Sequence, residues 1–300
     1  EAQTFLVLPE WDIVRGAEEL AEAMKDGRPS RFPFFASIVR FWSVRAAARR
    51  AVSGVYPPNT GYQVMIGVIG VCYAVEHGLK GLYENTLGRL TERAVPTPAD
   101  EALRKAAADY AEFLHHTPWY DFPFGAARRE FRSASSGGPW SLRKTERRAY
   151  GTVMLAVMGA WAKVIKKATG AAYAPEDLTL RAWVRAPRPP RGVKLLERLG
   201  PRDFLVELPR YQAFQGAMRA VFADGGRFIE LAGNRRIALT VLAPAGWDGA
   251  RLWDGALDSW PVYSRPAKRR FALAVPVAQL HLALNDLHAQ GALIEHVYDY

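Results

Sequence analysis

One pattern of secondary structure occurs twice in the C-terminal third of the sequence, and it constrains the fold more than any other feature. Each copy has a short apolar strand that stops at a proline, a helix that stops at a glycine, and a second strand. The copies span residues 204–231 and 271–298. Right-handed βαβ crossovers that share an antiparallel sheet, with both helices on one face, bury such elements. We therefore predict a ferredoxin-like α+β sandwich.

The sequence before this repeat has the apolar periodicity of helices. The start of one helix is especially clear, because Thr97 suits the cap, Pro98 the first helical position and Asp100 the third position of a capping box. We expect a mostly helical N-terminal domain. Its main predicted helices cover residues 17–25, 34–52, 63–90, 98–116 and 142–169.

A proline- and arginine-rich stretch separates the two regions. Three prolines in Arg185–Arg191 argue against a helix or a central strand there, because proline lacks an amide donor and has a fixed backbone angle. The predicted domains are therefore a helical domain at 1–184, a linker at 185–202 and a ferredoxin-like domain at 203–300, with an aromatic insert at 244–268.

The formal net charge of +10 is concentrated in the middle of the chain. Residues 128–202 contain seventeen Lys or Arg and five Asp or Glu, so this band carries +12 and the rest of the chain −2. A local excess of cations attracts polyanions. We predict binding to an anionic membrane surface or an acidic protein partner, with nucleic acid as the alternative. The candidate polyanion-binding residues are Arg40, Arg45, Arg49, Arg143, Lys144, Arg147, Arg148, Lys166 and Lys167.

The predicted helix at 34–52 places aromatic side chains next to arginines. Phe41 and Trp42 lie close in sequence to Arg45 and Arg49. This composition is typical of an interfacial helix on anionic lipid. An ordinary core helix whose arginines reach solvent has the same composition, so both interpretations stay open.

The predicted helix at 63–90 is the most apolar of the chain. Its uninterrupted apolar run, Val64–Val75, is twelve residues long, whereas a membrane-spanning helix needs about 20. We expect a buried core helix, with membrane insertion as the alternative.

Polar residues follow this apolar run at helical spacing. An enzyme would use such carboxylates or a histidine as acid or base and nearby cations to hold an anionic substrate. The simpler interpretation is a salt bridge between Glu76 and Lys80, which lie one helical turn apart. The candidate catalytic residues, if the chain is an enzyme, are Glu76, His77, Lys80, Glu84 and Arg89.

The insert at 244–268 contains Trp247, Trp253 and Trp260. Exposed tryptophans beside aspartates form ligand-stacking edges, but tryptophans that cover a sheet give the same pattern. The spacing of its acids does not match a calcium loop. The sequence lacks the common metalloprotease, serine hydrolase and nucleotide-binding motifs, so we predict no metal and no cofactor.

These features favour a non-catalytic accessory or scaffold protein over an enzyme or a nucleic-acid-binding protein. Its basic helical domain would dock on a membrane or an acidic partner, and its C-terminal module would serve pairing or ligand sensing, including homo-oligomer formation through the sheet. A single cysteine, Cys72, and the lack of a signal-peptide pattern in the first thirty residues suggest a cytoplasmic or peripheral membrane location.

Overall fold

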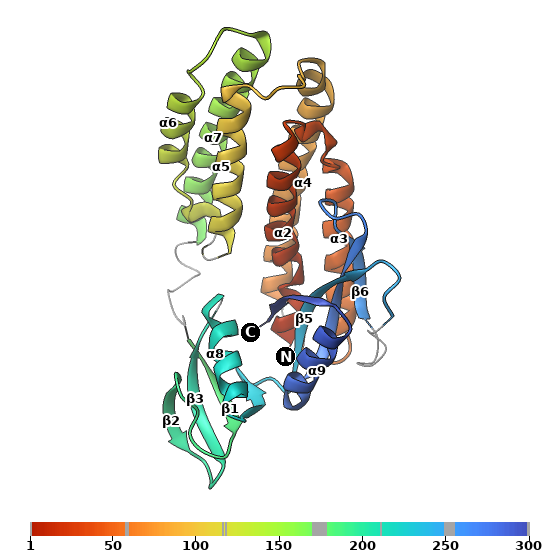
Figure 1. The fold of residues 1–300 in the computed structure, drawn as a ribbon, viewed down its shortest axis with the longest axis vertical. Coiled ribbons are helices and arrows are strands. Elements are labelled where there is room, and N and C mark those ends of the chain that lie inside the picture. The colour runs from red at the N-terminus through yellow and green to blue at the C-terminus, as the bar shows by residue number, and fades with distance from the viewer. Residues whose placement is uncertain are drawn as a thin grey trace. The chain divides into compact units, whose positions relative to one another are not determined.

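The computed structural model of the chain describes residues 2–57, 60–115, 117, 119–169, 179–210, 212–248 and 256–298. Helices fill the N-terminal half, and two four-stranded antiparallel sheets form the C-terminal half, so the fold class is α+β (Figure 1). The chain divides into two compact units. We call Glu10–Phe41 and Met65–Ala174 the helix unit, and Glu1–Pro9, Trp42–Val64 and Pro175–Tyr300 the sheet unit.

Most of the predicted helices are present, but the one expected at 17–25 begins nine residues earlier, at Leu8, and the helix Phe124–Ala134 was not predicted. The helices expected at 34–52 and 142–169 have these bounds, and the long apolar helix ends in a π-helix at Glu84–Gly88. The helices formed by the described residues are α1 (Ala2–Leu6), α2 (Leu8–Ala23), α3 (Phe34–Val52), α4 (Thr60–Tyr83), α5 (Pro98–Leu114), α6 (Phe124–Ala134), α7 (Leu142–Thr169), α8 (Gln212–Ala223) and α9 (Leu280–Ala289).

The capping box predicted at the start of α5 is confirmed. The Asp100 amide donates to Thr97 Oγ1 at 3.3 Å, and the Thr97 amide donates to the Asp100 carboxylate at 2.9 Å. Pro98 takes the first helical position, where a missing amide costs nothing. The cap also holds the Asp100 carboxylate in place for Arg143 of α7, which donates to it at 2.9 Å.

Close packing of α6 and α7 depends on a glycine. A Cβ atom on Gly151 of α7 would lie 2.4 Å from the ring of Phe131 in α6. Near the other end of the same pair, Phe122, Phe124 and Met158 belong to one buried apolar cluster. Glycine at 151 therefore sets how near the two helices approach.

Helices α4 and α7 contact each other through their side chains. Tyr83 and Tyr150 stack with ring centroids 3.8 Å apart, and the Cys72 side chain lies near that of Trp161. Because the first contact joins the end of α4 to the start of α7 and the second joins their middle parts, the two helices run antiparallel.

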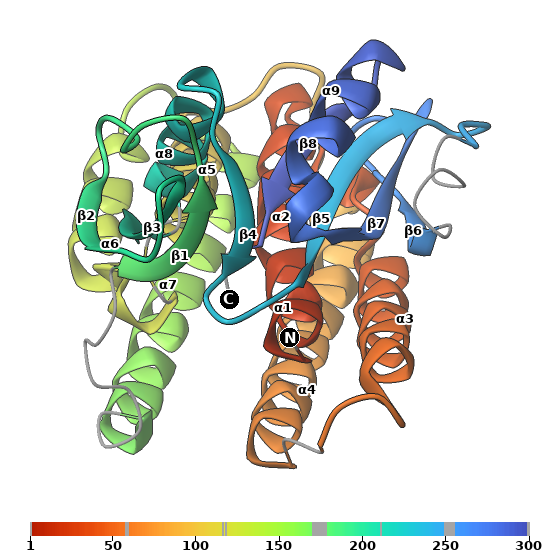
Figure 2. The same cartoon turned by 90° about the horizontal axis from the view of Figure 1, so that it is seen from below.

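The C-terminal repeat forms two sheets instead of one. The strands are β1 (Thr179–Arg185), β2 (Lys194–Arg198), β3 (Asp203–Pro209), β4 (Arg227–Leu231), β5 (Arg236–Pro244), β6 (Ala256–Pro261), β7 (Lys268–Pro276) and β8 (Leu293–Val297). The first sheet has the order β2-β3-β1-β4 and the second β6-β7-β5-β8, with antiparallel neighbours throughout. Figure 2 shows both sheets with their helices α8 and α9.

The single ferredoxin-like sandwich is thus not confirmed. Two further strands precede each copy of the repeat: β1 and β2 come before the first copy, and β5 and β6 before the second. The predicted repeat did not include these strands. With these strands each copy has enough hydrogen-bonding partners to complete a sheet of its own. The segment expected as a linker, 185–202, contains β2, and the insert expected at 244–268 contains β6.

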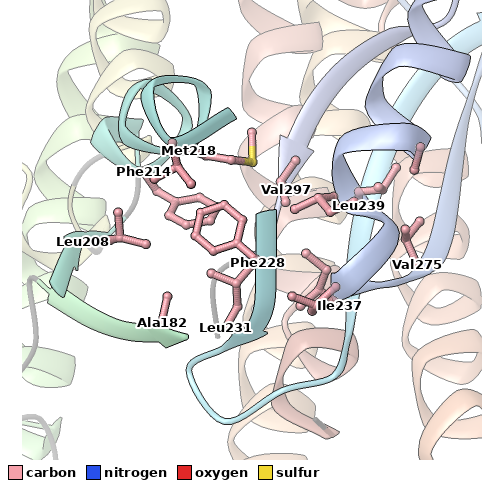
Figure 3. Packing of buried hydrophobic residues seen from close by; sticks show 14 of the residues in the cluster. Ala182, Leu208, Phe214, Met218, Phe228, Leu231, Ile237, Leu239, Val275 and Val297 are labelled. Atoms are coloured by element: carbon pink, nitrogen blue, oxygen red, sulfur yellow. The ribbon is translucent and has the colours of Figure 1, made fainter. Parts of the chain in front are cut away.

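One continuous apolar core joins the two sheets within the sheet unit. Phe214 of α8, Phe228 of β4, Leu239 of β5 and Val297 of β8 are all buried members of this cluster (Figure 3). The start of the chain also belongs here, since the Ala238 amide of β5 donates to Thr4 Oγ1 of α1 at 3.0 Å. The sheet unit therefore combines the two ends of the sequence.

Candidate functional site

The helix unit contains a partly open cavity of about 110 Å³. Residues of α2, α4, α5 and α7 form most of its wall, and the majority of the side chains are apolar. The polar side chains come mainly from the last turns of α4 and the π-helix. The lining consists of Ile13, Ala17, Leu20, Met24, Pro29, Phe34, Tyr73, Glu76, His77, Lys80, Glu84, Leu103, Ala106, Ala107, Tyr110, Phe122, Phe124, Tyr150, Met154, Leu155 and Met158.

The cavity brings four of the five candidate catalytic residues together. Glu76, His77, Lys80 and Glu84 all line it. Their spacing on one helix turns them toward the same wall, which is the arrangement that the sequence predicted. The fifth candidate, Arg89, is exposed and is not part of the lining.

Glu76 and Lys80 form an ion pair within this wall. Lys80 Nζ lies 2.5 Å from Glu76 Oε1, and both side chains are mostly buried. Burial opposes ionisation of Glu76, but the Lys80 ammonium outweighs it and lowers the pKa of the Glu76 carboxyl. The pair stays charged and contributes no net charge to the cavity.

His77 is the least satisfied polar group of the cavity. Its side chain is 5% exposed, and neither ring nitrogen makes a hydrogen bond of good geometry with a described residue, although the Tyr73 carbonyl lies nearby. The Tyr73 ring packs against the imidazole with centroids 3.9 Å apart. Burial lowers the pKa of His77 to about 3. The ring is therefore neutral at pH 7, with one nitrogen as donor and the other as acceptor.

Glu84 also lines the cavity, and its carboxylate forms an ion pair with Arg147. Arg147 of α7 donates to both Glu84 oxygens, at 2.5 and 2.6 Å. Beside it, Arg143 donates to Asp100 and, at 2.7 Å, to the Gly88 carbonyl that the π-helix presents. A buried arginine in such a bidentate pair fixes the relative position of its two helices.

Three of the candidate polyanion-binding arginines therefore lie inside the helix unit. Arg143 and Arg147 are at most 1% exposed, and Arg40 is 4% exposed. Arg40 pairs with Asp12 at 2.8 Å and Glu19 at 2.9 Å. Internal carboxylates neutralise all three guanidinium groups, so we do not count these arginines as part of a basic surface.

The remaining candidate cations are nearer the surface, and several have local partners. Lys144 donates to the backbone carbonyls of the 136–139 loop, Lys166 pairs with Asp121 at 2.6 Å, and Arg45 lies over the Trp42 ring. Arg49 and Lys167 are exposed and Arg148 is half-buried. The structure thus separates buried, paired cations from surface cations among the candidate polyanion-binding residues.

The candidate stacking tryptophans do not form one edge. Trp247 packs against the core with its ring 5.0 Å from that of Phe271, and its indole nitrogen donates to Gln290 at 3.1 Å. Trp260 of β6 is 6% exposed, and Trp253 lies outside the described residues. The two described tryptophans cover the sheet.

A feature that the sequence analysis missed is an exposed apolar face on the outer side of α4 and α7. Its side chains are between 41% and 62% exposed. Trp161 belongs to this face and also lies near Cys72 of α4, so the stripes of the two helices are close to each other there. We call the following residues the apolar face: Val68, Val71, Val75, Leu79 and Leu82 of α4, and Val153, Val157, Trp161 and Val164 of α7.

The long apolar helix is less buried than expected. Among the described residues, the helix Thr60–Gly88 alone is long and apolar enough to cross a membrane, and 28% of its most apolar window is buried. The expectation of a fully buried core helix holds for one side only. The helical spacing of Val68, Val71 and Val75 indicates that they share one side of the helix. Periodicity does not reveal whether that side faces the core or the solvent.

The fold and this cavity define an α+β protein whose helix unit has a mostly apolar cavity with a few polar side chains in its wall, and an apolar face on its surface. No protein family model, no curated protein and no solved structure matches the chain. Its function therefore has to be inferred from the geometry of these two features.

Proposed function

We propose that this chain is an accessory protein that docks on an anionic membrane surface through the apolar face of α4 and α7. The observation that carries the proposal is the exposure of nine large apolar side chains on two adjoining helices. Soluble monomers rarely expose contiguous apolar patches of this kind unless the patch contacts a partner or a membrane.

The charges around the apolar face favour lipid as the occupant. Among the residues of α4 and α7 whose side chains are described, no Asp or Glu is exposed. The exposed cations lie toward helix ends: Arg89 just after α4, and Lys163 and Lys167 in the last turns of α7, where Lys166 is paired with Asp121. An apolar surface bordered by cations matches an acyl layer bordered by anionic headgroups.

The exposed surface of α5 has a different character. The exposed positions of α5 include Glu101, Lys105, Asp109 and Glu112, and Arg104 pairs with Glu101. A helix surface that carries acidic and basic side chains side by side is typical of one exposed to water. The helix unit as a whole is therefore amphipathic.

The expected binding energy is sufficient for reversible docking. Each apolar side chain is already about half buried, so its transfer into lipid contributes about 1 kcal/mol, and each lysine near an anionic surface adds about 1 kcal/mol. The sum of these apolar and lysine contributions must exceed the free energy that is lost when the protein is restricted to the membrane surface. We expect binding that weakens with salt, because the lysine contribution is screened.

Vesicle sedimentation tests the proposal. We expect the full chain to bind phosphatidylcholine vesicles that contain phosphatidylserine, and to bind pure phosphatidylcholine more weakly. The double variant Val71→Glu/Val75→Glu should reduce binding at least about tenfold, because each carboxylate would have to be desolvated. The matched variant Ala108→Glu/Ala126→Glu adds the same charge at exposed positions of α5 and α6 and should reduce it much less.

Two results would refute docking on lipid. One is equal sedimentation with both kinds of vesicle, or with neither. The other is size-exclusion chromatography in which the wild type elutes as a dimer and Val71→Glu/Val75→Glu as a monomer, because a second copy would then cover the apolar face.

A further inference from the structure

The cavity in the helix unit contains a polar side chain that is unpartnered in the described part of the chain, which an ordinary packing void would not contain. Empty cavities in proteins are apolar, and buried polar groups normally have partners. Here the His77 imidazole lines the cavity with both nitrogens unpartnered among the described residues. Leaving such groups unsatisfied costs free energy that a ligand with a matching polar group would recover.

The charges in the wall determine what kind of polar group fits. Glu76 is paired with Lys80, and Glu84 is paired with Arg147, so the acids of the lining are neutralised locally. A charged ligand would lose its hydration without gaining a free counter-charge. An uncharged hydroxyl or carbonyl group needs only one hydrogen bond, which neutral His77 supplies as donor or acceptor.

The tyrosines of the wall keep the same neutral character. Burial raises the pKa of Tyr110 well above its usual value, and the charge of Glu76 raises it further. Burial, followed by the charge of Glu84, likewise raises the pKa of Tyr150. Both phenols are therefore uncharged at pH 7 and present aromatic surface to the cavity.

Size limits the ligand further. The cavity measures about 110 Å³, whereas an engineered apolar cavity of about 150 Å³ holds benzene. The wall around His77 is aromatic, with Tyr73 against its ring and the Phe34 ring centroid 5.9 Å away. The volume therefore limits the ligand to at most one small ring, and the aromatic wall suits such a ring.

We propose that this cavity is a binding site for a small, uncharged, ring-sized molecule that carries one hydroxyl or carbonyl group, with that group hydrogen-bonded to His77. The apolar part of the molecule lies against the side chains of α5 and α7, including Leu103, Ala107 and Met154. This site is independent of membrane docking, because the apolar face and the cavity wall use different residues of α4.

Isothermal titration of the full chain with phenol, benzene and benzoate tests the site. We expect phenol to bind more tightly than benzene, and benzoate not to bind. The variant His77→Phe keeps an aromatic ring but removes the hydrogen bond, so it should weaken phenol about 5- to 10-fold and leave benzene nearly unchanged.

A second pair of variants locates the site. Ala107→Phe places a ring in the cavity from α5 and should abolish binding of both phenol and benzene. Ala108→Phe makes the same change at the next, exposed position of α5 and should bind both as the wild type does. Circular dichroism and thermal unfolding would show whether the variants keep the native fold.

The proposal would be overturned if phenol bound no better than benzene, if benzoate bound as well as phenol, or if a folded Ala107→Phe still bound phenol. Absence of phenol binding at millimolar concentration would also overturn it, since the cavity would then hold only water. Preferential phenol binding that is lost with Ala107→Phe and weakened by His77→Phe would establish the site.

Discussion

At the scale of single residues, the neutral state of His77 links the cavity to the stability of the protein. An exposed histidine has a pKa near 6.5, whereas burial lowers that of His77 to about 3 in the folded chain. Between these values the unfolded chain binds a proton that the folded chain excludes. The contribution to stability is therefore fully present above pH of about 6.5 and is lost as the pH falls toward 3.

This linkage predicts a measurable pH effect. Lowering the pH from 7.5 to 5 should reduce the free energy of unfolding by about 1 to 2 kcal/mol through His77 alone. Urea unfolding at the two pH values should show a smaller reduction for His77→Phe. The variant His288→Phe changes an exposed histidine of α9 and should keep the wild-type dependence. An unchanged pH dependence in His77→Phe would contradict the prediction.

Residue types and spacing anticipated part of the cavity but not its partners. Glu76 and Lys80 are one turn apart on one helix, so their pairing follows from local geometry. Glu84 and Arg147 are 63 positions apart, and a formal charge in the sequence does not indicate whether it is neutralised across such a distance. Arg143 and Arg147 were therefore assigned to a surface from which tertiary folding removes them.

At the scale of elements, the helices were predictable because their local signals agree with their tertiary surroundings. The capping box of Thr97 and Asp100 fixes the start of α5 in sequence and in structure. Strand β1 was missed although Leu180, Ala182 and Val184 alternate with exposed or half-buried residues. The prolines that follow β1 suggested a linker, yet a strand needs only its own residues to be free of proline.

Two helical glycines provide a matched test of packing between elements. Nothing lies within 4 Å of a Cβ atom added to Gly78 of α4, whereas one added to Gly151 of α7 would overlap Phe131. Gly78→Ala should therefore stabilise the chain by about 0.5 to 1 kcal/mol through helix propensity. Gly151→Ala should destabilise it by about 1 to 3 kcal/mol through overpacking. Urea unfolding measures both, and stabilisation by Gly151→Ala would show that α6 and α7 separate easily.

At the scale of the whole molecule, the domain boundaries depend on contacts that no local pattern reports. The sheet unit includes Glu1–Pro9 as well as Pro175–Tyr300. Side chains of α1 and the residues after it, among them Phe5, Leu6 and Val7, are at most 4% exposed. On sequence alone these residues fall in the predicted helical domain, because an apolar stretch of this length does not reveal which sheet or helix it covers.

The hydrogen bond between α1 and β5 gives the last prediction. Thr4 Oγ1 accepts from the Ala238 amide at 3.0 Å across 234 positions, in a buried setting. Thr4→Val keeps the size of the side chain but leaves this amide of β5 without its acceptor, so the free energy of unfolding should fall by about 1 to 2 kcal/mol. Thr4→Ser keeps the hydroxyl and should lose less. If urea unfolding gives the same stability for Thr4→Val and the wild type, α1 does not contribute to the sheet unit through this bond, and its contribution must come from Phe5, Leu6 and Val7 alone.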